Sequence, residues 1–131
     1  MARLPLLLIS LVIAGCAIPG ATLDDRPGVA GTYIVNGVDP VGIEYSGTVA
    51  IEATEDPGRF TVVWVITGAI LEGDGIVDGD TFTVEWRTIR GPRGDSSGTA
   101  VYLVQPDGRL TGTRTIDGVD GTGTEEIFPE S

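Results

Sequence analysis

The stretch that decides the fold covers residues 43–67 and reads IEYSGTVAIEATEDPGRFTVVWVIT. In its first part, apolar residues at every second position alternate with polar residues such as Glu44, Ser46 and Glu52. This period of two is typical of a strand with one buried face. Asp56-Pro57-Gly58 provides a turn, and the same alternation resumes from Phe60. The stretch therefore predicts two antiparallel strands joined by a short connection.

The same pattern, punctuated by Gly, Pro and Asp-Gly turns, predicts one strand before this stretch and five after it. The eight expected strands lie at residues 31–36, 43–53, 60–67, 69–77, 81–89, 99–105, 109–116 and 121–128. Sequential antiparallel strands with short links predict an all-β, up-and-down meander. A sheet of about eight strands curls and closes, which removes its exposed edges. We expect a small closed barrel, and a two-sheet β-sandwich is the alternative that the pattern allows.

The inward positions of these strands carry aromatic rings, with glycines on the same faces giving the rings room. The expected interior aromatics are Tyr33, Tyr45, Phe60, Trp64, Phe82, Trp86 and Tyr102. Apolar residues also fall on the outer face, at Ile34, Val63, Val65, Val101 and Leu103. Scattered, they would carry no meaning, whereas a contiguous group would form a patch for a partner or a second subunit.

The start of the chain has the layout of a bacterial export signal that ends in a lipobox, Ile13-Ala14-Gly15-Cys16. The expected organisation is an N-terminal signal helix over residues 1–15, a lipidated Cys16 with a flexible tether over residues 16–30, and a β-barrel-like domain over residues 31–131. Cleavage between Gly15 and Cys16, with palmitate-type acylation of Cys16, predicts a lipid-anchored protein of the bacterial cell envelope.

In a host with two membranes we expect the outer one, because Ala17 lacks the acidic character that retains lipoproteins at the inner membrane. An ordinary signal peptide, in which Cys16 is only a small apolar residue, is the alternative.

The amino-acid composition excludes several classes of function. The chain carries 19 acidic and 8 basic residues, a net charge of −11, with no histidine and a single cysteine. The charge argues against nucleic acid as a partner. The missing residue types exclude Ser-His and Cys-His catalysis and the usual zinc sites, so we expect no metal, no cofactor and no enzyme. A carboxylate pair that hydrolyses a glycosidic bond is the enzymatic alternative, although many of the acids fall at turns.

Two polar features could serve binding. Arg114 and Glu125 share the inward faces of the last two expected strands, and a pair between them could be a structural clasp or a polar anchor for a ligand. Arg93-Gly94-Asp95 matches an adhesion tripeptide, but a chain with this many Arg, Gly and Asp residues produces such a match by chance. We interpret it as part of a solvated loop at residues 91–97.

A family pattern runs through nearly the whole body: GTYxVxGxxPxG at residues 31–42, YxG at 45–47, VW at 63–64 and PDGxLxG at 106–112. It resembles a family of small exported bacterial proteins, mostly uncharacterised and some labelled fibronectin-binding. The Gly-x-aromatic opening of a meander is also similar to that of lipocalins and avidins, whose eight-stranded barrels bind small ligands inside. The second likeness is architectural, because no binding residue can be matched.

These observations predict a non-catalytic binding or structural protein at the envelope. One hypothesis, which the family label favours, is a protein-binding module, adhesin-like or inhibitor-like, that uses loops and outer face. The alternative is a binder of a small apolar ligand inside the barrel. A cavity of several hundred Å³ would favour the small ligand, and a packed core with an apolar outer patch would favour the protein partner.

Overall fold

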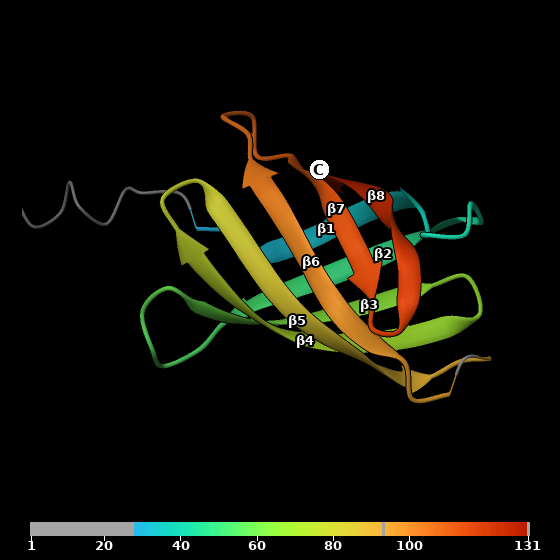
Figure 1. Cartoon of the computed structure of the whole chain (residues 1–131). Helices are drawn as coiled ribbons and strands as arrows, with labels where there is room; N and C mark the ends of the chain where they lie inside the picture. Colours follow the sequence, from blue (N-terminus) through green and yellow to red (C-terminus); the bar gives the residue numbers. More distant parts are fainter. Residues whose placement is uncertain (1–27, 93, 131) are drawn as a thin grey trace, which may run out of the picture.

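The computed structural model describes residues 28–92 and 94–130. Its strands are β1 (Gly31–Val38), β2 (Glu44–Ala53), β3 (Arg59–Ile66), β4 (Ala69–Asp78), β5 (Thr81–Arg90), β6 (Ser97–Val104), β7 (Leu110–Ile116) and β8 (Val119–Pro129). Each strand pairs antiparallel with the next, and β8 pairs with β1, so the sheet closes on itself (Figure 1). The prediction of an all-β closed barrel is confirmed, and the sandwich alternative is not adopted.

Strand direction defines two ends of the barrel. The connections at residues 54–58, 79–80 and 105–109 meet at the end where β1 begins, which we call the closed end. The connections at residues 39–43, 67–68, 91–96 and 117–118 meet at the opposite end, which we call the open end. In Figure 1 the closed end lies to the left and the open end to the right. The chain therefore enters the barrel at the closed end.

Inward side chains alternate with outward ones along every strand and form one core. Phe60 and Phe82 pack edge to face with ring centroids 5.8 Å apart, and Tyr102 stacks on Phe82 at 6.2 Å. At the closed end Val29 is buried, and the Tyr33 hydroxyl donates a hydrogen bond to its carbonyl oxygen at 2.6 Å. Aromatic packing and the residues before β1 thus contribute to the core toward this end of the barrel.

The predicted exchange of large side chains for glycine is visible inside the sheet. A Cβ atom added to Gly75 would lie 2.5 Å from the Phe82 ring, and one added to Gly112 would lie 2.7 Å from the Tyr102 ring. Both distances are well below van der Waals contact, so these positions have no space for a side chain. Glycine is what allows the two rings to lie flat against neighbouring strands.

Several strand boundaries differ from the sequence expectation. β1 continues past Asn36 to Val38, because Gly37 and Val38 still pair with β2 and β8. The turn that follows is instead organised by Asp39, whose Oδ1 accepts hydrogen bonds from the backbone of Val41 and Ile43. β6 begins at Ser97 and β8 at Val119. The early start of β8 follows from a two-residue turn at residues 117–118, with Gly118 at a φ of 82°.

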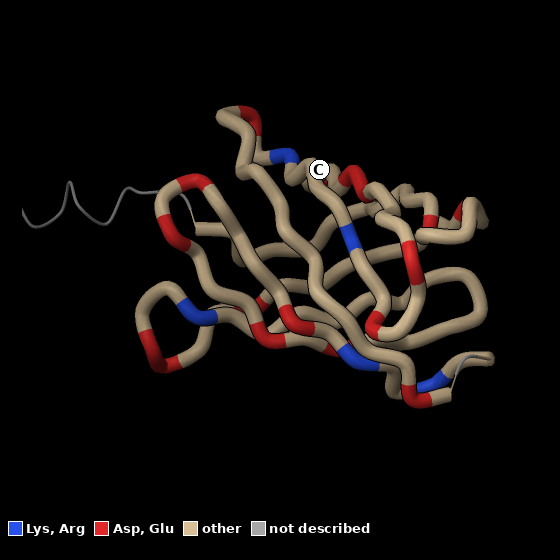
Figure 2. Tube along the Cα trace, viewed as in Figure 1, with Lys and Arg blue, Asp and Glu red and all other residues tan. Residues whose placement is uncertain are grey.

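The outward apolar side chains expected from the sequence fall into two separate groups, and Ile76 on β4 and Ile89 on β5 are further exposed apolar residues. Ile34, Val63 and Val65 lie on β1 and β3, on either side of β2. Val101 and Leu103 lie on β6, which is separated from the first group by β4 and β5 in one direction and by β7 and β8 in the other. The residues expected from the sequence therefore do not make one contiguous patch. Acidic residues predominate over the surface of the traced chain (Figure 2).

Within residues 28–92 and 94–130, no helix is long and apolar enough to cross a membrane. The same residues contain no group of three or more His, Cys, Asp or Glu side chains that could hold a metal ion.

Candidate functional site at the open end of the barrel

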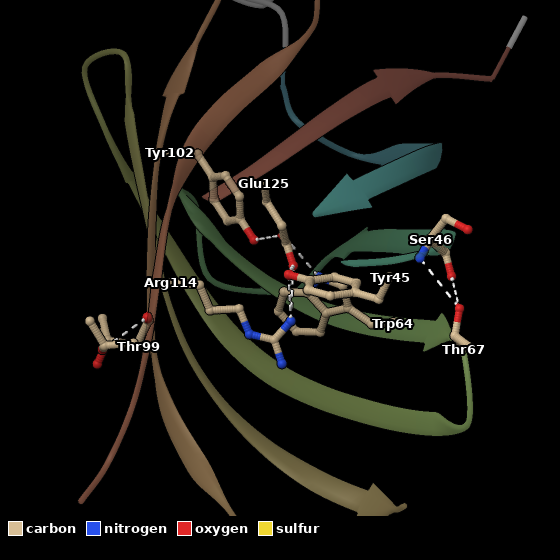
Figure 3. Close-up of polar contacts among 9 residues, drawn as sticks. Tyr45, Ser46, Trp64, Thr67, Thr99, Tyr102, Arg114 and Glu125 are labelled. Atoms are coloured by element: carbon tan, nitrogen blue, oxygen red, sulfur yellow. Dashed lines mark hydrogen bonds and ion pairs between the residues drawn. The ribbon is translucent and has the colours of Figure 1, made fainter. Parts of the chain in front are cut away.

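Glu125 is the centre of a buried polar cluster. Its carboxylate accepts hydrogen bonds from the hydroxyls of Tyr45 and Tyr102, from Trp64 Nε1 at 3.4 Å and from Arg114 Nη1 at 2.9 Å (Figure 3). The residue is 1% exposed. All four partners are donors, so the ionised carboxylate, which only accepts, is the form that satisfies the cluster.

The strand register explains why the cluster forms. Arg114 on β7 lies opposite Gly123 on β8, and Glu125 lies opposite Gly112. The charged residues are therefore diagonal neighbours on the inner face of one strand pair, within reach of long side chains. Each faces a glycine, so no side chain competes for the space across the pair.

Arg114 is held among aromatic rings. Its guanidinium carbon lies 4.3 Å from the Trp86 ring centroid, 5.3 Å from that of Tyr45 and 6.0 Å from that of Trp64. These distances are within the range of cation–π attraction. The Nη1 atom also donates to the Tyr45 hydroxyl at 3.0 Å. The arginine is 6% exposed and is fixed in place by an anion on one side and by ring faces around it.

The pKa values of Arg114, Tyr45 and Tyr102 are all raised above their ordinary values. Burial acts to lower the pKa of Arg114, but the neighbouring Tyr45 and Glu125 outweigh it, and the net shift is upward. The pKa values of Tyr45 and Tyr102 are also raised, first by burial and then by the negative charge of Glu125. Arg114 therefore stays charged and both hydroxyls stay protonated in the neutral pH range.

A cavity of about 320 Å³ opens from this cluster toward the open end. Its lining is mainly apolar, and it includes Arg114 and Trp86 from the cluster. Its other lining residues are Asp39, Ile43, Glu44, Tyr45, Ile66, Thr67, Ala69, Leu71, Thr88, Gly91, Pro92, Ser96 and Ile116. The hydroxyls of Thr88 and Ser96 lie 2.9 Å apart and join β5 to the connection before β6. A mainly apolar cavity with a few converging polar groups is the usual form of a small-molecule site.

Two nitrogen donors of this site have no hydrogen-bond partner among the described residues. They are Trp86 Nε1 and Arg114 Nε, and both are buried. A third such atom, Arg109 Nε, lies near the closed end, where Asp107 Oδ2 is 3.1 Å away and meets its charge. A buried N–H without an acceptor costs about 1–3 kcal/mol. Both Trp86 and Arg114 line the cavity, so an oxygen acceptor that reached these N–H groups would remove this cost.

The closed end has a hollow of its own, of about 670 Å³, between residues 28–29 and the connection before β7. Val29, Tyr33, Val104 and Leu110 are part of its wall. The Tyr33 hydroxyl already donates its hydrogen bond to the Val29 carbonyl oxygen, so this aromatic residue offers the hollow no free donor. The two hollows therefore differ in volume, about 320 against 670 Å³, and in the donors that they offer.

The structure brings together most of the residues singled out in the sequence. Tyr45, Trp64 and Tyr102 bind Glu125, and Trp86 covers Arg114, whereas Tyr33 lies apart at the closed end. Sequence reasoning missed that the aromatic tips share one acceptor. The available signal was that five of the expected interior aromatics, the three tyrosines and two tryptophans, carry an O–H or N–H that must find a partner when buried.

Three other sequence features receive no structural test. Gly15 and Cys16, the proposed cleavage and lipidation residues, lie outside the described residues, and so does Arg93 of the Arg-Gly-Asp tripeptide. The two remaining residues of that tripeptide, Gly94 and Asp95, are exposed in the connection between β5 and β6.

Comparison with known proteins gives a fold and no family. No family model and no curated protein matches this chain. Among solved structures it is similar to a redesigned β-barrel, with a TM-score of 0.67 and 15% identity over 79% of this chain and 92% of that one. A redesigned β-barrel bound to DFHBI matches with a TM-score of 0.64 and 16% identity over 78% and 94% of the two chains.

A de novo designed fluorescence-activating β-barrel matches with a TM-score of 0.56 and 18% identity, over 77% of this chain and 93% of that one. At such identities the likeness establishes the barrel architecture alone.

Proposed function

We propose that this protein is a non-catalytic binding protein that takes a small, mainly apolar molecule into the open end of its barrel. The observation that carries the proposal is the cavity of about 320 Å³ whose inner wall includes a buried arginine and a tryptophan with unused N–H groups. Its volume is at the lower end of the range for ligand sites. The designed barrel that binds DFHBI supports the proposal by architecture only.

The alternative use of the outer face has weaker support. A protein-binding surface of stable size buries roughly 800 Å² on each partner and has an apolar centre. The outward apolar residues expected from the sequence lie on opposite parts of the wall, with Val65 in one group and Leu103 in the other. The cavity therefore supports a small ligand better than this surface supports a protein partner.

The lipobox adds a proposed location. If Cys16 carries lipid, the protein is tethered to the bacterial cell envelope by the segment that enters the barrel at the closed end. The open end then lies on the side away from the attachment point. A Cys16→Ser variant of the full chain, expressed in a bacterium, is expected in the soluble fraction after lysis, whereas the unchanged chain sediments with membranes. Equal membrane association of both proteins would contradict the anchor.

The binding proposal is tested by blocking the cavity. Ile66 and Val104 are matched positions, because each is the last residue of its strand, points inward and is half-buried. Ile66 lines the cavity at the open end and Val104 lines the hollow at the closed end. An Ile66→Trp substitution fills the cavity with a ring, and Val104→Trp places the same ring at the other end.

The two variants and the unchanged protein are incubated with a panel of small uncharged aromatic compounds. Native mass spectrometry then measures the ligand mass that each protein retains. Retained ligand mass is expected for the unchanged protein and for Val104→Trp, and its loss is expected for Ile66→Trp. Retention by Ile66→Trp with loss in Val104→Trp would place the ligand at the closed end. No retained mass in any of the three proteins would contradict small-molecule binding.

A further inference from the structure

The guanidinium of Arg114 has two sides with different roles. Nη1 is turned inward, where it donates to Glu125 at 2.9 Å and to Tyr45 at 3.0 Å. The other terminal nitrogen points away from the carboxylate (Figure 3). Nε is buried and has no partner within the described part of the chain. The inner side of the arginine is thus satisfied, and its outer side retains N–H groups on a residue that lines the cavity.

Trp86 adds a second donor beside this outer side. Its ring lies against the guanidinium at 4.3 Å, and the residue is 3% exposed. Its Nε1 has no acceptor among the described residues. Two neighbouring, buried residues of the cavity wall therefore both present unused N–H groups and no acceptor of their own.

We infer that the ligand of this cavity is an uncharged, ring-containing molecule that presents an oxygen acceptor, such as a carbonyl, to the N–H groups of Arg114 and Trp86. This inference rests on the proposed function and specifies its ligand class. A hydrocarbon would leave both donors without a partner, which costs free energy in a buried site. An acceptor oxygen removes that cost and fixes the orientation of the ring.

The charges around the cavity disfavour an anionic ligand. The charge of Arg114 is already met by Glu125, and the whole chain carries a net charge of −11. Glu44 also lines the cavity. An anionic ligand would therefore enter a negative field and meet an arginine that is already neutralised. A cationic ligand is disfavoured because Arg114 already places a positive charge in the cavity wall, against one face of Trp86 and one face of Tyr45.

The walls explain the preference for a ring. Apolar side chains and the Tyr45 and Trp86 rings make up much of the lining. Flat apolar ligands gain most from such surfaces, because aromatic pairs contribute about 0.5–1.5 kcal/mol beyond the area they bury. A compact two-ring molecule is of a size that a cavity of about 320 Å³ accommodates.

Three matched probes test the inference: 2-acetylnaphthalene, 2-ethylnaphthalene and 2-naphthoate, which share a ring system and differ in the group attached to it. Isothermal titration calorimetry of the purified protein is expected to give about three- to tenfold tighter binding of the ketone than of the hydrocarbon, the factor that one hydrogen bond provides. The carboxylate is expected to bind more weakly than both.

Two variants assign the effect. Arg114→Lys keeps a positive charge facing Glu125 but removes Nε and the outward nitrogen, and Trp86→Phe keeps a ring but removes the indole N–H. Each is expected to reduce the ratio of ketone affinity to hydrocarbon affinity, whatever change the substitution makes to the hydrocarbon affinity itself. If Arg114→Lys does not fold, as judged by circular dichroism, Trp86→Phe still provides the test. In the unchanged protein, the indole N–H of Trp86 should shift in ¹H–¹⁵N spectra with the ketone and not with the hydrocarbon.

The outcomes distinguish a wrong ligand class from a failure of small-molecule binding itself. Equal affinity for ketone and hydrocarbon, or an advantage that persists in both variants, would overturn the inference and leave small-molecule binding intact. Tightest binding of the carboxylate would also overturn it, by showing an anion site. Failure of all three probes to bind would count against the proposed function as well.

Discussion

The two ends of the barrel are built by the same eight strands, yet they use their aromatic residues differently. Toward the closed end, Phe60 and Phe82 pack ring against ring. Toward the open end, Tyr45 and Trp86 surround a buried arginine beside a cavity. Tyr102 connects the two regions, since its ring stacks on Phe82 and its hydroxyl donates to Glu125. Rings thus pack on one another toward the closed end, whereas toward the open end they hold a buried charge beside a cavity.

Removal of Glu125 should cause the largest loss of stability at the open end. A Glu125→Leu substitution leaves the Arg114 charge buried without its counter-ion and deprives two tyrosine hydroxyls of their acceptor. We expect the free energy of unfolding to fall by about 4–5 kcal/mol, as for other broken buried pairs. Urea denaturation measures the loss.

The double variant Arg114→Met with Glu125→Leu is the control for that substitution. Apolar residues of similar volume replace both charges, and we expect most of the lost stability to return. A double variant as unstable as Glu125→Leu alone would show that the hydroxyl and indole donors, rather than the unpaired charge, cause the damage.

Phe82→Ala tests the closed end. The Phe82 side chain is fully buried between Phe60 and Tyr102. Truncation creates a cavity, and we expect unfolding by urea to require about 3–4 kcal/mol less free energy. Ligand retention in native mass spectrometry should persist in the folded fraction, because the cavity at the open end is untouched. A loss of binding that exceeds the loss of folded protein would show that the two ends are coupled.

The sequence predicted the closed barrel and only part of the polar site at its open end, and it placed the buried Val29 in the tether. Alternation in β2 and β3, with turn residues at regular intervals, predicted the strands and their closure. It predicted the inward faces of Arg114 and Glu125 as well. A pattern of faces does not, however, give the height of each side chain along the barrel axis. That height depends on the register between strands, and the register brings Tyr45 and Trp64 to Glu125 while leaving Tyr33 beside Val29.

The cavity could not be predicted for a related reason. Its walls come from β2, β3, β4, β5 and β7 together with residues of the connections, such as Asp39 and Pro92. Whether side chains fill a barrel end depends on how these connections lie over it, which composition does not specify. The strand ends at Val38 and Ser97 show the same limitation, because pairing with neighbours carried both strands beyond their turn signals.

Alkaline pH should weaken the open end through its tyrosines. The pKa values of Tyr45 and Tyr102 are raised above the ordinary 10.0, so their neutral forms stabilise the fold fully below pH 10. Above pH 10 the unfolded chain loses these protons and the folded one retains them, so stability falls as the pH rises. Between pH 9 and 11 we expect a loss of about 2–3 kcal/mol from the two groups together.

Urea denaturation at several pH values checks this expectation, with Tyr102→Phe as the comparison. That variant lacks one of the three tyrosines whose pKa is raised, so its stability should fall less steeply over the same pH interval. An unchanged slope would show that the Tyr102 hydroxyl titrates alike in the folded and unfolded chains.

The smallest expected changes in stability compare an inward-facing with an outward-facing residue of the barrel wall. Val62 and Val63 are neighbours on β3, but Val62 is 1% exposed and Val63 is 37% exposed. Substitution by threonine places the same hydroxyl on either face. Val62→Thr should lower the free energy of unfolding by about 1–2 kcal/mol, because the hydroxyl enters an apolar interior. Val63→Thr should stay within about 0.5 kcal/mol of the unchanged protein.

This pair of substitutions also measures how far the polar site extends down the barrel. Val62 does not line the cavity at the open end, and a Cβ at its β4 neighbour Gly73 would lie 2.6 Å from Val84, so this level of the interior is filled. A filled interior gives a threonine hydroxyl no water to bind. If thermal denaturation shows both variants to be equally stable, water reaches Val62 from the open end. The polar region of the interior would then extend past Val62 toward the first residues of β3.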